Sequence, residues 1–305
     1  MAAQENKTFH LVGVGVTHSI APNMHNYIAK SLDLSWTFYA TECPTLESVL
    51  QLAKEDSTVG LVVTMPYKNA IMPHLDELDE LATAIGACNN VYYKRDAAGK
   101  RLLCGTNTDW IGIRGCLKSV TGKASDQLTS TALIIGAGGA SRAAVYALSS
   151  HLSCSTIYVL NRDDQEVLDL IRDSKKLPDV PEIVHIKSVE QAAQCSSPDY
   201  IVGTVPDFEP KTDAEINVAA ILKGFLERPE KGILLDMCFK PRRTRTIKLA
   251  ESLGWPCVEG THIIGYQIEK QYALWAGDKK AQDLDVNGAW ETLMTAAKES
   301  KGINF

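Results

Sequence analysis

Short apolar runs alternate with segments of helical periodicity along most of the chain. In the first part, strand-like runs lie at 10–16, 59–63 and 90–93, and helical patterns cover 21–30 and 75–85. This alternation predicts a first α/β unit. The polar stretch 121–130 then interrupts the periodicity, and we place a domain boundary there.

A strongly apolar strand over 131–136 opens the second half. Further strand-like runs follow at 155–160, 183–185, 200–203 and 232–236, with helix-like segments between them. Such alternation predicts a parallel, doubly wound sheet of the Rossmann type. Beyond Gly260 the chain becomes helical, over 261–276 and 286–299, and we expect these helices to return to the first domain. The predicted α/β fold therefore has two domains, 1–122 plus 261–305 and 123–260.

Composition narrows the class of protein. Apolar residues make up 45% of the 305 residues and charged residues 22%, which excludes a disordered chain. The net charge of −6 argues against a nucleic-acid partner, so we interpret the basic run 240–248 as a solvated helix start or an aid to cofactor phosphates. With no secretory signal and no long apolar run, we expect a cytoplasmic protein without a membrane partner.

The eight cysteines form no Cys-x-x-Cys pair. Several fall in predicted strands or on helix faces, which favours buried reduced thiols over disulfides or a zinc site. The histidines at 18 and 25 have no companion ligands in the sequence, and we expect no metal.

A glycine-rich turn joins a buried strand to a helix. The strand 132–135 runs into Gly136-Ala-Gly-Gly-Ala140, where the backbone can turn tightly and approach a pyrophosphate. The helix amino terminus then offers unpaired N–H groups and a favourable dipole. The turn therefore predicts a dinucleotide cofactor, with an ordinary strand-to-helix turn as the alternative.

The next strand ends at Asn161-Arg162-Asp163, where such a domain meets the adenosine ribose. Arg162 could bind a 2′-phosphate, whereas Asp163, Asp164 and Glu166 would repel one. The balance favours NAD over NADP. The acids at 164 and 166 can equally begin a solvated helix at its positive end.

Four further short segments place hydroxyl, amide or charged groups beside a proline or glycine. They are 17–22, 62–68, 85–91 and 105–109. Together they would form a polar pocket suited to a small, oxygen-rich, anionic substrate.

The order of these motifs resembles that of the shikimate/quinate dehydrogenase family over nearly the whole chain. The motifs are the His-Ser-x-x-Pro loop, Val-Thr-x-Pro-x-Lys, Gly-Ala-x-Asn, Asn-Thr-Asp, the glycine-rich turn and a late Gly…Gln helix. The resemblance implies a two-domain enzyme in which C-terminal helices complete the substrate domain and the substrate meets a nicotinamide in the cleft. A folded sensor that binds the ring acid without chemistry is the alternative of another class.

The resemblance also assigns residues. Lys68 and Asp109 would form the catalytic pair and contact the substrate, because oxidation of a ring alcohol needs a group that accepts the hydroxyl proton. Ser19 would hold the carboxylate, and Thr64, Asn89 and Gln267 the ring hydroxyls. The expected cofactor-binding residues are Gly136, Ala137, Gly138, Gly139, Ala140, Asn161, Arg162, Asp163, Thr204, Val205 and Gly260.

Three departures from the biosynthetic pattern concern the substrate. Ala21 stands where a second Ser is usual, Gly203 where an Asn is usual, and Phe239 where a Tyr is common. In this respect the chain is similar to the fungal-type quinate dehydrogenases. The resemblance then implies NAD-dependent oxidation of quinate, with overlapping activity on shikimate. The alternative is an NADP-dependent shikimate dehydrogenase of aromatic biosynthesis.

Overall fold

The chain folds into two compact units. The computed structural model of the protein describes residues 6–120 and 130–305. One unit comprises Met1–Thr108 and Ile264–Phe305, and the other comprises Asp109–Ile263. The segment 121–129, where the sequence predicts the boundary, lies outside the described residues.

The helix that precedes this segment differs from expectation. Helix α5 (Asp109–Val120) belongs to the second unit and not to the first. Its Trp110 stacks on His151 of α6 (Gly139–Leu152), with ring centroids 4.3 Å apart. Because this aromatic contact fastens α5 to α6, the compact second unit starts at Asp109.

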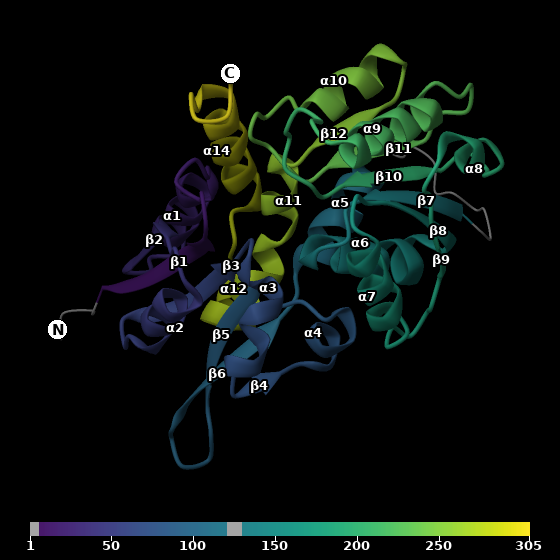
Figure 1. Ribbon diagram of the computed structural model, residues 1–305. Helices are drawn as coiled ribbons and strands as arrows, with labels where there is room; N and C mark the ends of the chain where they lie inside the picture. The colour runs from purple at the N-terminus through teal and green to yellow at the C-terminus, as the bar shows by residue number, and fades with distance from the viewer. Residues whose placement is uncertain (1–5, 121–129) are drawn as a thin grey trace. The chain divides into compact units, whose positions relative to one another are not determined.

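The first unit is built on a mixed sheet in the order β2-β1-β3-β5-β6-β4 (Figure 1). Its strands are β1 (Lys7–Gly13), β2 (Trp36–Glu42), β3 (Thr58–Val63), β4 (Glu77–Leu78), β5 (Asn90–Arg95) and β6 (Arg101–Thr106). Strands β2 and β3 both pair with β1 in parallel, whereas β5 is antiparallel to β3 and β6.

Helices cover both faces of this sheet. Phe9 and Phe38 pack with Ala21 of α1 (Ala21–Ser31) and Trp275 of α12 (Ile268–Ala276) on one face. On the other, Val12 and Leu61 pack with α2 (Leu46–Lys54) and α3 (Tyr67–Ala70). From Ile264 onward, the C-terminal helices belong to the first unit. They are α11 (Thr261–Tyr266), α12, α13 (Asp278–Ala281) and α14 (Val286–Glu299), and α14 packs on α1.

The second unit confirms the predicted doubly wound parallel sheet, in the order β12-β11-β10-β7-β8-β9. Its strands are β7 (Ser130–Ile135), β8 (Cys154–Leu160), β9 (Glu182–His185), β10 (Tyr200–Gly203), β11 (Ile233–Asp236) and β12 (Cys257–Glu259), all paired in parallel. Helices α6 and α7 (Asp164–Ser174) lie on one face (Figure 1). The opposite face carries α8 (Val189–Ala193), α9 (Asp213–Leu226) and α10 (Arg245–Ser252).

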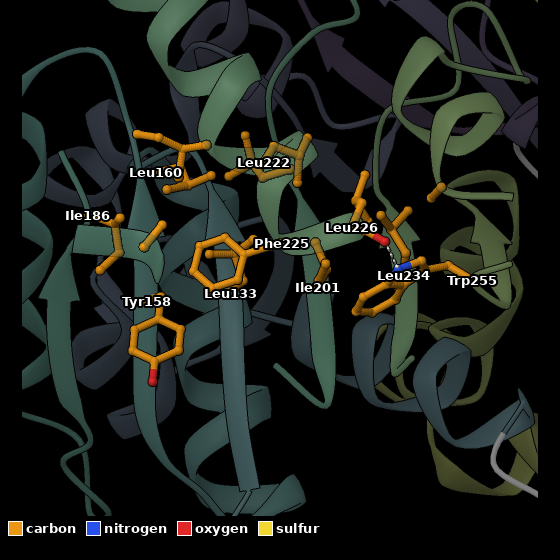
Figure 2. Close-up of a cluster of buried hydrophobic side chains, with 14 of the residues drawn as sticks. Leu133, Tyr158, Leu160, Ile186, Ile201, Leu222, Phe225, Leu226, Leu234 and Trp255 are labelled. Atoms are coloured by element: carbon orange, nitrogen blue, oxygen red, sulfur yellow. Dashed lines mark hydrogen bonds between the residues drawn. The ribbon is translucent and has the colours of Figure 1, made fainter. Parts of the chain in front are cut away.

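One apolar cluster fixes α9 on this sheet. Figure 2 shows Phe225 and Leu222 of α9 against Leu133 and Ile201, from two neighbouring strands. Trp255 also packs in this cluster. Its Nε1 donates to the carbonyl oxygen of Leu226 at 2.9 Å. Each fully buried side chain of this size contributes about 1.5–3 kcal/mol. The cluster therefore holds the strands in register, and open α/β sheets bind ligands at the carboxyl ends of their strands.

The predicted helix over 75–85 is wrong in its first half. The chain forms a 3₁₀ turn (Met72–His74), then β4, and only then α4 (Glu80–Ile85), which begins where Asp79 Oδ1 accepts the Ala82 N–H at 2.7 Å. Leu75 and Leu78 both crowd Gly105 of β6, where an added Cβ would lie within 3 Å of each. Packing against β6 thus keeps this segment extended.

The cysteines are free thiols, five of them buried. Within 6–120 and 130–305, no helix has both the length and the apolar character needed to cross a bilayer.

Candidate functional site

Three side chains from distant parts of the sequence meet in the first unit. Gln267 Oε1 accepts hydrogen bonds from Asn89 Nδ2 at 2.9 Å and from Thr108 Oγ1 at 2.6 Å. Asn89 Oδ1 in turn accepts the Thr108 backbone N–H at 2.6 Å. All three residues are buried, Asn89 to 1% exposure and Gln267 to 6%. The structure therefore brings together two of the predicted substrate-binding residues and adds Thr108 to them.

Local structure explains this meeting. Asn89 directly precedes β5, and Thr108 directly precedes α5. Gln267 separates α11 from α12, so the expected continuous helix over 261–276 is interrupted at this residue. Two turns further along α12, Trp275 Nε1 donates to the Val91 carbonyl oxygen at 3.2 Å. This bond fastens α12 to β5 and fixes the position of Gln267 against Asn89.

Gln271 lies one helical turn after Gln267 and is buried. Its side-chain oxygen Oε1 has no hydrogen-bond partner within the described residues. Leaving such an acceptor unsatisfied costs about 1–3 kcal/mol, so an O–H donor would be favourable there. This is the chemistry that a polyhydroxylated ligand supplies.

Lys68 is attached to the same region through its backbone. It lies in the short helix α3 and is half-buried, and its carbonyl oxygen accepts the Cys88 N–H at 2.8 Å. The preceding Tyr67 donates from its hydroxyl to the Cys43 carbonyl oxygen at 2.8 Å. Thr64 follows β3 and donates its N–H to Val12 at 2.9 Å. The Val-Thr-x-Pro-x-Lys segment is therefore held at both ends.

Asp109 is the first residue of α5 and is buried. The peptide bond from Thr108 joins it directly to the amide cluster of the first unit. A carboxylate in the first turn of a helix is favoured by the helix dipole. The pairing of Asp109 with Lys68 stays a prediction.

Ser19 lies at the end of a loop that a carboxylate holds. Glu42, the last residue of β2, accepts the Gly15 N–H at 2.5 Å and the Val16 N–H at 3.0 Å. The Ser19 N–H donates to Val16 O at 2.9 Å, and Ser19 Oγ accepts the Ala21 N–H at 3.2 Å. Glu42 therefore shapes the loop that carries Ser19.

The glycine-rich turn adopts a conformation that suits a dinucleotide. Gly136 has φ 110°, and a Cβ there would lie 2.4 Å from Thr204 Oγ1 and 2.8 Å from Val205 Cγ1. A Cβ at Gly138, the N-cap of α6, would meet open space. The structure brings Gly136, Thr204 and Val205 together and leaves room beside the helix N-terminus, where a pyrophosphate is favoured.

Arg142 braces this turn. Its Nη1 donates to the carbonyl oxygens of Ala137 at 3.0 Å and Gly138 at 3.3 Å, and its Nη2 donates to Asp173 of α7 at 2.6 Å. Burial raises the pKa of Asp173, but its bonds to Arg142 and the charge of Arg172 outweigh this and bring the pKa below its ordinary value. The Asp173 carboxylate therefore stays ionised at neutral pH.

The three polar residues after β8 make hydrogen bonds within the second unit. Asp163 Oδ1 caps α7 by accepting the N–H groups of Gln165 and Glu166 at 2.8 and 3.0 Å. Asn161 Nδ2 donates to Glu166 Oε2 at 2.8 Å. Arg162 Nη1 donates to Glu215 Oε1 of α9 at 2.5 Å.

A buried carboxyl group ends β11. Asp236 is 4% exposed, and its Oδ2 and Oδ1 accept from Thr244 Oγ1 at 2.7 Å and from the Cys238 N–H at 3.1 Å. Burial, helped by the charge of Asp207, raises its pKa to about 6 despite these hydrogen bonds. A Cβ at Gly203 would lie 2.9 Å from Asp236 Oδ1, which accounts for glycine at that position.

Glycine is also required at Gly260, where a Cβ would lie 2.3 Å from the Met237 carbonyl oxygen. The arginines of the neighbouring basic run are engaged by acids. Arg242 and Arg243 donate to Glu259 at 3.2 and 3.0 Å, and Arg243 also pairs with Glu251. These ion pairs lower the positive charge of the run.

Sequence reasoning missed the residues that hold the predicted ones. They are Glu42, Thr108, Arg142, Asp173, Glu215 and Asp236. Two of them had a local signal, since Thr108 is the threonine of the Asn-Thr-Asp motif and Arg142 stands three residues after the last glycine of the turn.

Known proteins match most of this chain. A family model described as the shikimate dehydrogenase substrate binding domain matches residues 11–91. The chain is 33% identical over 286 residues to a quinate dehydrogenase of Emericella nidulans, covering 88% of this chain and 87% of that protein. It is 36% identical over 281 residues to the pentafunctional AROM polypeptide of Eremothecium gossypii, covering 90% of this chain but 17% of the polypeptide.

A solved structure has the same fold. The shikimate 5-dehydrogenase of Thermus thermophilus, in complex with NADP(H) and shikimate, superposes with a TM-score of 0.71 at 27% identity. The match covers 95% of this chain and 99% of that one.

Proposed function

This chain belongs to the shikimate and quinate dehydrogenase family of oxidoreductases, and on that premise we propose that it oxidises quinate to the 3-dehydro acid with NAD as the cofactor. The observation that carries the proposal is the buried cluster of Asn89, Thr108 and Gln267. These oriented amides and the hydroxyl, with Ser19 and Thr64 on neighbouring loops, suit a ring that carries several hydroxyl groups and a carboxylate.

In this proposal Lys68 accepts the proton of the hydroxyl that is oxidised. Proton transfer by a positioned side chain is typically worth about 10²–10⁴-fold in rate. Asp109 orients the amine and the substrate hydroxyl, while Asn89 and Gln267 bind the other ring hydroxyls. Ser19 holds the carboxylate. When bound, the nicotinamide ring supplies the acceptor for the hydride that leaves the same carbon atom.

The second unit fits such a cofactor. The open space beside Gly138 and the N-terminus of α6 would hold the pyrophosphate, and Arg142 fixes the two carbonyl groups of the turn. Ala137, Gly139 and Ala140 complete this turn, and Thr204, Val205 and Gly260 line the adjoining strand ends. A nicotinamide dinucleotide is therefore the cofactor class that we propose.

The ribose segment supports NAD over NADP. The guanidinium group of Arg162 is already paired with Glu215, and Asp163 adds a second negative charge next to it. A 2′-phosphate would meet these acids, whereas a free 2′-hydroxyl group would not be repelled.

Ala21 supports quinate as the preferred substrate. Its methyl group is buried with Phe9 and Phe38, and its N–H is bound by Ser19 Oγ. A Ser at this position would add the hydroxyl group that the biosynthetic pattern has in this loop. Quinate carries an extra hydroxyl on the carbon that bears its carboxylate, and we propose that the loop without the Ser hydroxyl accommodates it.

The test is a cofactor-reduction assay with four combinations, quinate or shikimate with NAD or NADP. Quinate with NAD should give the highest kcat/KM, and shikimate should be used less well with the same cofactor. Absence of dinucleotide reduction with all four would contradict the proposal.

The second candidate is NADP-dependent shikimate oxidation. Arg162, the residue type that binds a 2′-phosphate, favours it, and the Thermus thermophilus structure contains NADP(H) and shikimate. In the same assay this function would give the highest kcat/KM for shikimate with NADP.

A further inference from the structure

We propose that Glu215 is a cofactor-specificity residue, which holds the guanidinium group of Arg162 and so withholds it from the 2′-phosphate of NADP. The inference rests on the proposed dehydrogenase function and deepens it. It assigns the selectivity to a residue on α9, a helix that follows a different strand from the one at the ribose segment.

The geometry places the two residues in direct contact. Arg162 stands two residues after the end of β8, and Glu215 lies in the first turn of α9. Their contact joins Nη1 and Oε1 at 2.5 Å. Both residues belong to the second unit, so the pair forms within one compact body.

The Glu215 carboxylate is fixed before it meets the arginine. Its second oxygen, Oε2, accepts the backbone N–H groups of Lys211 and Thr212 at 3.0 and 3.1 Å, and Thr212 Oγ1 in turn accepts the Glu215 N–H. This reciprocal capping box orients the other oxygen toward Arg162. Arg162 therefore loses side-chain conformational entropy when it pairs with Glu215. The carboxylate loses little, because the capping box already fixes it.

The Glu215 carboxylate stays ionised at neutral pH. The backbone N–H groups of Lys211 and Thr212, followed by Arg162, lower the pKa of Glu215 to about 2. The Glu215 side chain is 27% exposed and that of Arg162 is 65% exposed. Solvent screens such a pair, so its effect on cofactor choice should be moderate rather than absolute.

A 2′-phosphate would have to compete with Glu215 for Arg162. It would also meet the negative charge of Glu215 itself, and that of Asp163, whose Oδ1 caps α7. A 2′-hydroxyl group is neutral and avoids both penalties. Glu215 thus acts against NADP and leaves NAD almost unaffected.

The test compares the wild type with Glu215→Gln, Arg162→Gln and the double variant. Glutamine keeps a side-chain oxygen for the two N–H groups of the cap. It removes the negative charge that pairs with Arg162. The readouts are the dissociation constants of NAD and NADP from calorimetry at low salt, together with kcat/KM for both. Glu215→Gln should raise NADP affinity relative to NAD by about fivefold, and added salt should weaken this gain.

The double variant separates a charge effect from a structural one. If Glu215 acts through Arg162, replacing Glu215 raises the NADP/NAD affinity ratio less in the Arg162→Gln background than in the wild type. Glu227→Gln, which removes one charge from the C-terminal end of the same helix, is the matched control and should leave the ratio unchanged. Thr212→Ala weakens the cap without changing charge. It should lower Tm and change the NADP/NAD ratio little.

An unchanged NADP/NAD affinity ratio in Glu215→Gln overturns the inference. An equal gain in this ratio when Glu215 is replaced in the Arg162→Gln background overturns it as well. Failure of the proposed function is distinct, because wild-type protein would then reduce neither dinucleotide with quinate or shikimate. Binding of NAD and NADP can be measured in either case.

Discussion

Thr108 donates a hydrogen bond from Oγ1 to Oε1 of Gln267 at 2.6 Å, and this bond joins the two stretches of chain that form the first unit. Thr108 is the last residue of the first stretch, and Gln267 lies near the start of the second. The same threonine also donates its N–H to Asn89. One residue therefore sets the orientation of both amides proposed to bind the ring hydroxyls.

Replacing Thr108 by Val should damage both stability and substrate binding. Gln267 loses one of the two buried donors to its Oε1, which costs about 1–3 kcal/mol, and its amide is held less firmly in the orientation proposed for substrate binding. We expect a higher KM for the ring acid and a lower free energy of unfolding in urea. Thr108→Ser keeps the hydroxyl and should recover most of both losses, and equal damage in the two variants would contradict this role.

Replacing Lys68 by Ala should abolish turnover while binding persists. Loss of the proton acceptor should lower kcat by about 10²–10⁴-fold, whereas the amide cluster continues to bind the ring. Steady-state kinetics and calorimetric titration with quinate measure the two effects separately. Lys94→Ala, at an exposed lysine of the same unit, is the control and should keep wild-type kinetics. Near-normal turnover in Lys68→Ala would show that another group accepts the proton.

Replacing Glu42 by Ala should raise KM more than it lowers kcat. The N–H groups of Gly15 and Val16 lose their acceptor, so the loop that carries Ser19 is held less firmly. We expect KM for quinate to rise by about tenfold, since a charged acceptor is worth about 1.5–3 kcal/mol. Glu42→Gln should lie between the wild type and the alanine variant. A loss confined to kcat would argue that Glu42 has another role.

Replacing Ala21 by Ser should shift substrate preference toward shikimate. The added hydroxyl restores the second Ser of the biosynthetic pattern in the loop that carries Ser19. A single hydroxyl of this kind discriminates by about 1–3 kcal/mol. The measurement is the ratio of kcat/KM for quinate and shikimate with NAD, and an unchanged ratio contradicts the interpretation of position 21.

The local parts of this architecture were predictable from sequence. The strand, glycine turn and helix around Gly136 follow one another directly in the chain, and the parallel sheet follows from the alternation of apolar runs with helical patterns. Glu42 and Glu215 were not predictable, because they lie 27 and 53 residues from the groups that they bind. Pairing over such separations depends on sheet order, which the sequence pattern does not specify.

The segment 75–85 shows the same limit within a single element. Its apolar spacing is typical of a helix, yet contact with Gly105 keeps Leu75 and Leu78 in an extended path. The break at Gln267 is similar, since the pattern over 261–276 is continuous while the hydrogen bonds of Gln267 are tertiary. Tertiary contact therefore overrides periodicity at positions next to the proposed site.

Asp236 should make the second unit less stable as pH rises. Its pKa is raised by burial from 3.8 to about 6, so the folded protein binds a proton that the unfolded chain releases near pH 4. The free energy of unfolding contributed by this group is therefore largest below about pH 4 and falls as pH rises through about 6, by on the order of 3 kcal/mol. Asp236→Asn keeps an acceptor for the Cys238 N–H and an amide for Thr244, but it does not titrate. Urea unfolding of both proteins should show the wild type losing stability relative to Asp236→Asn between about pH 4 and pH 7, and parallel pH profiles would contradict the assignment.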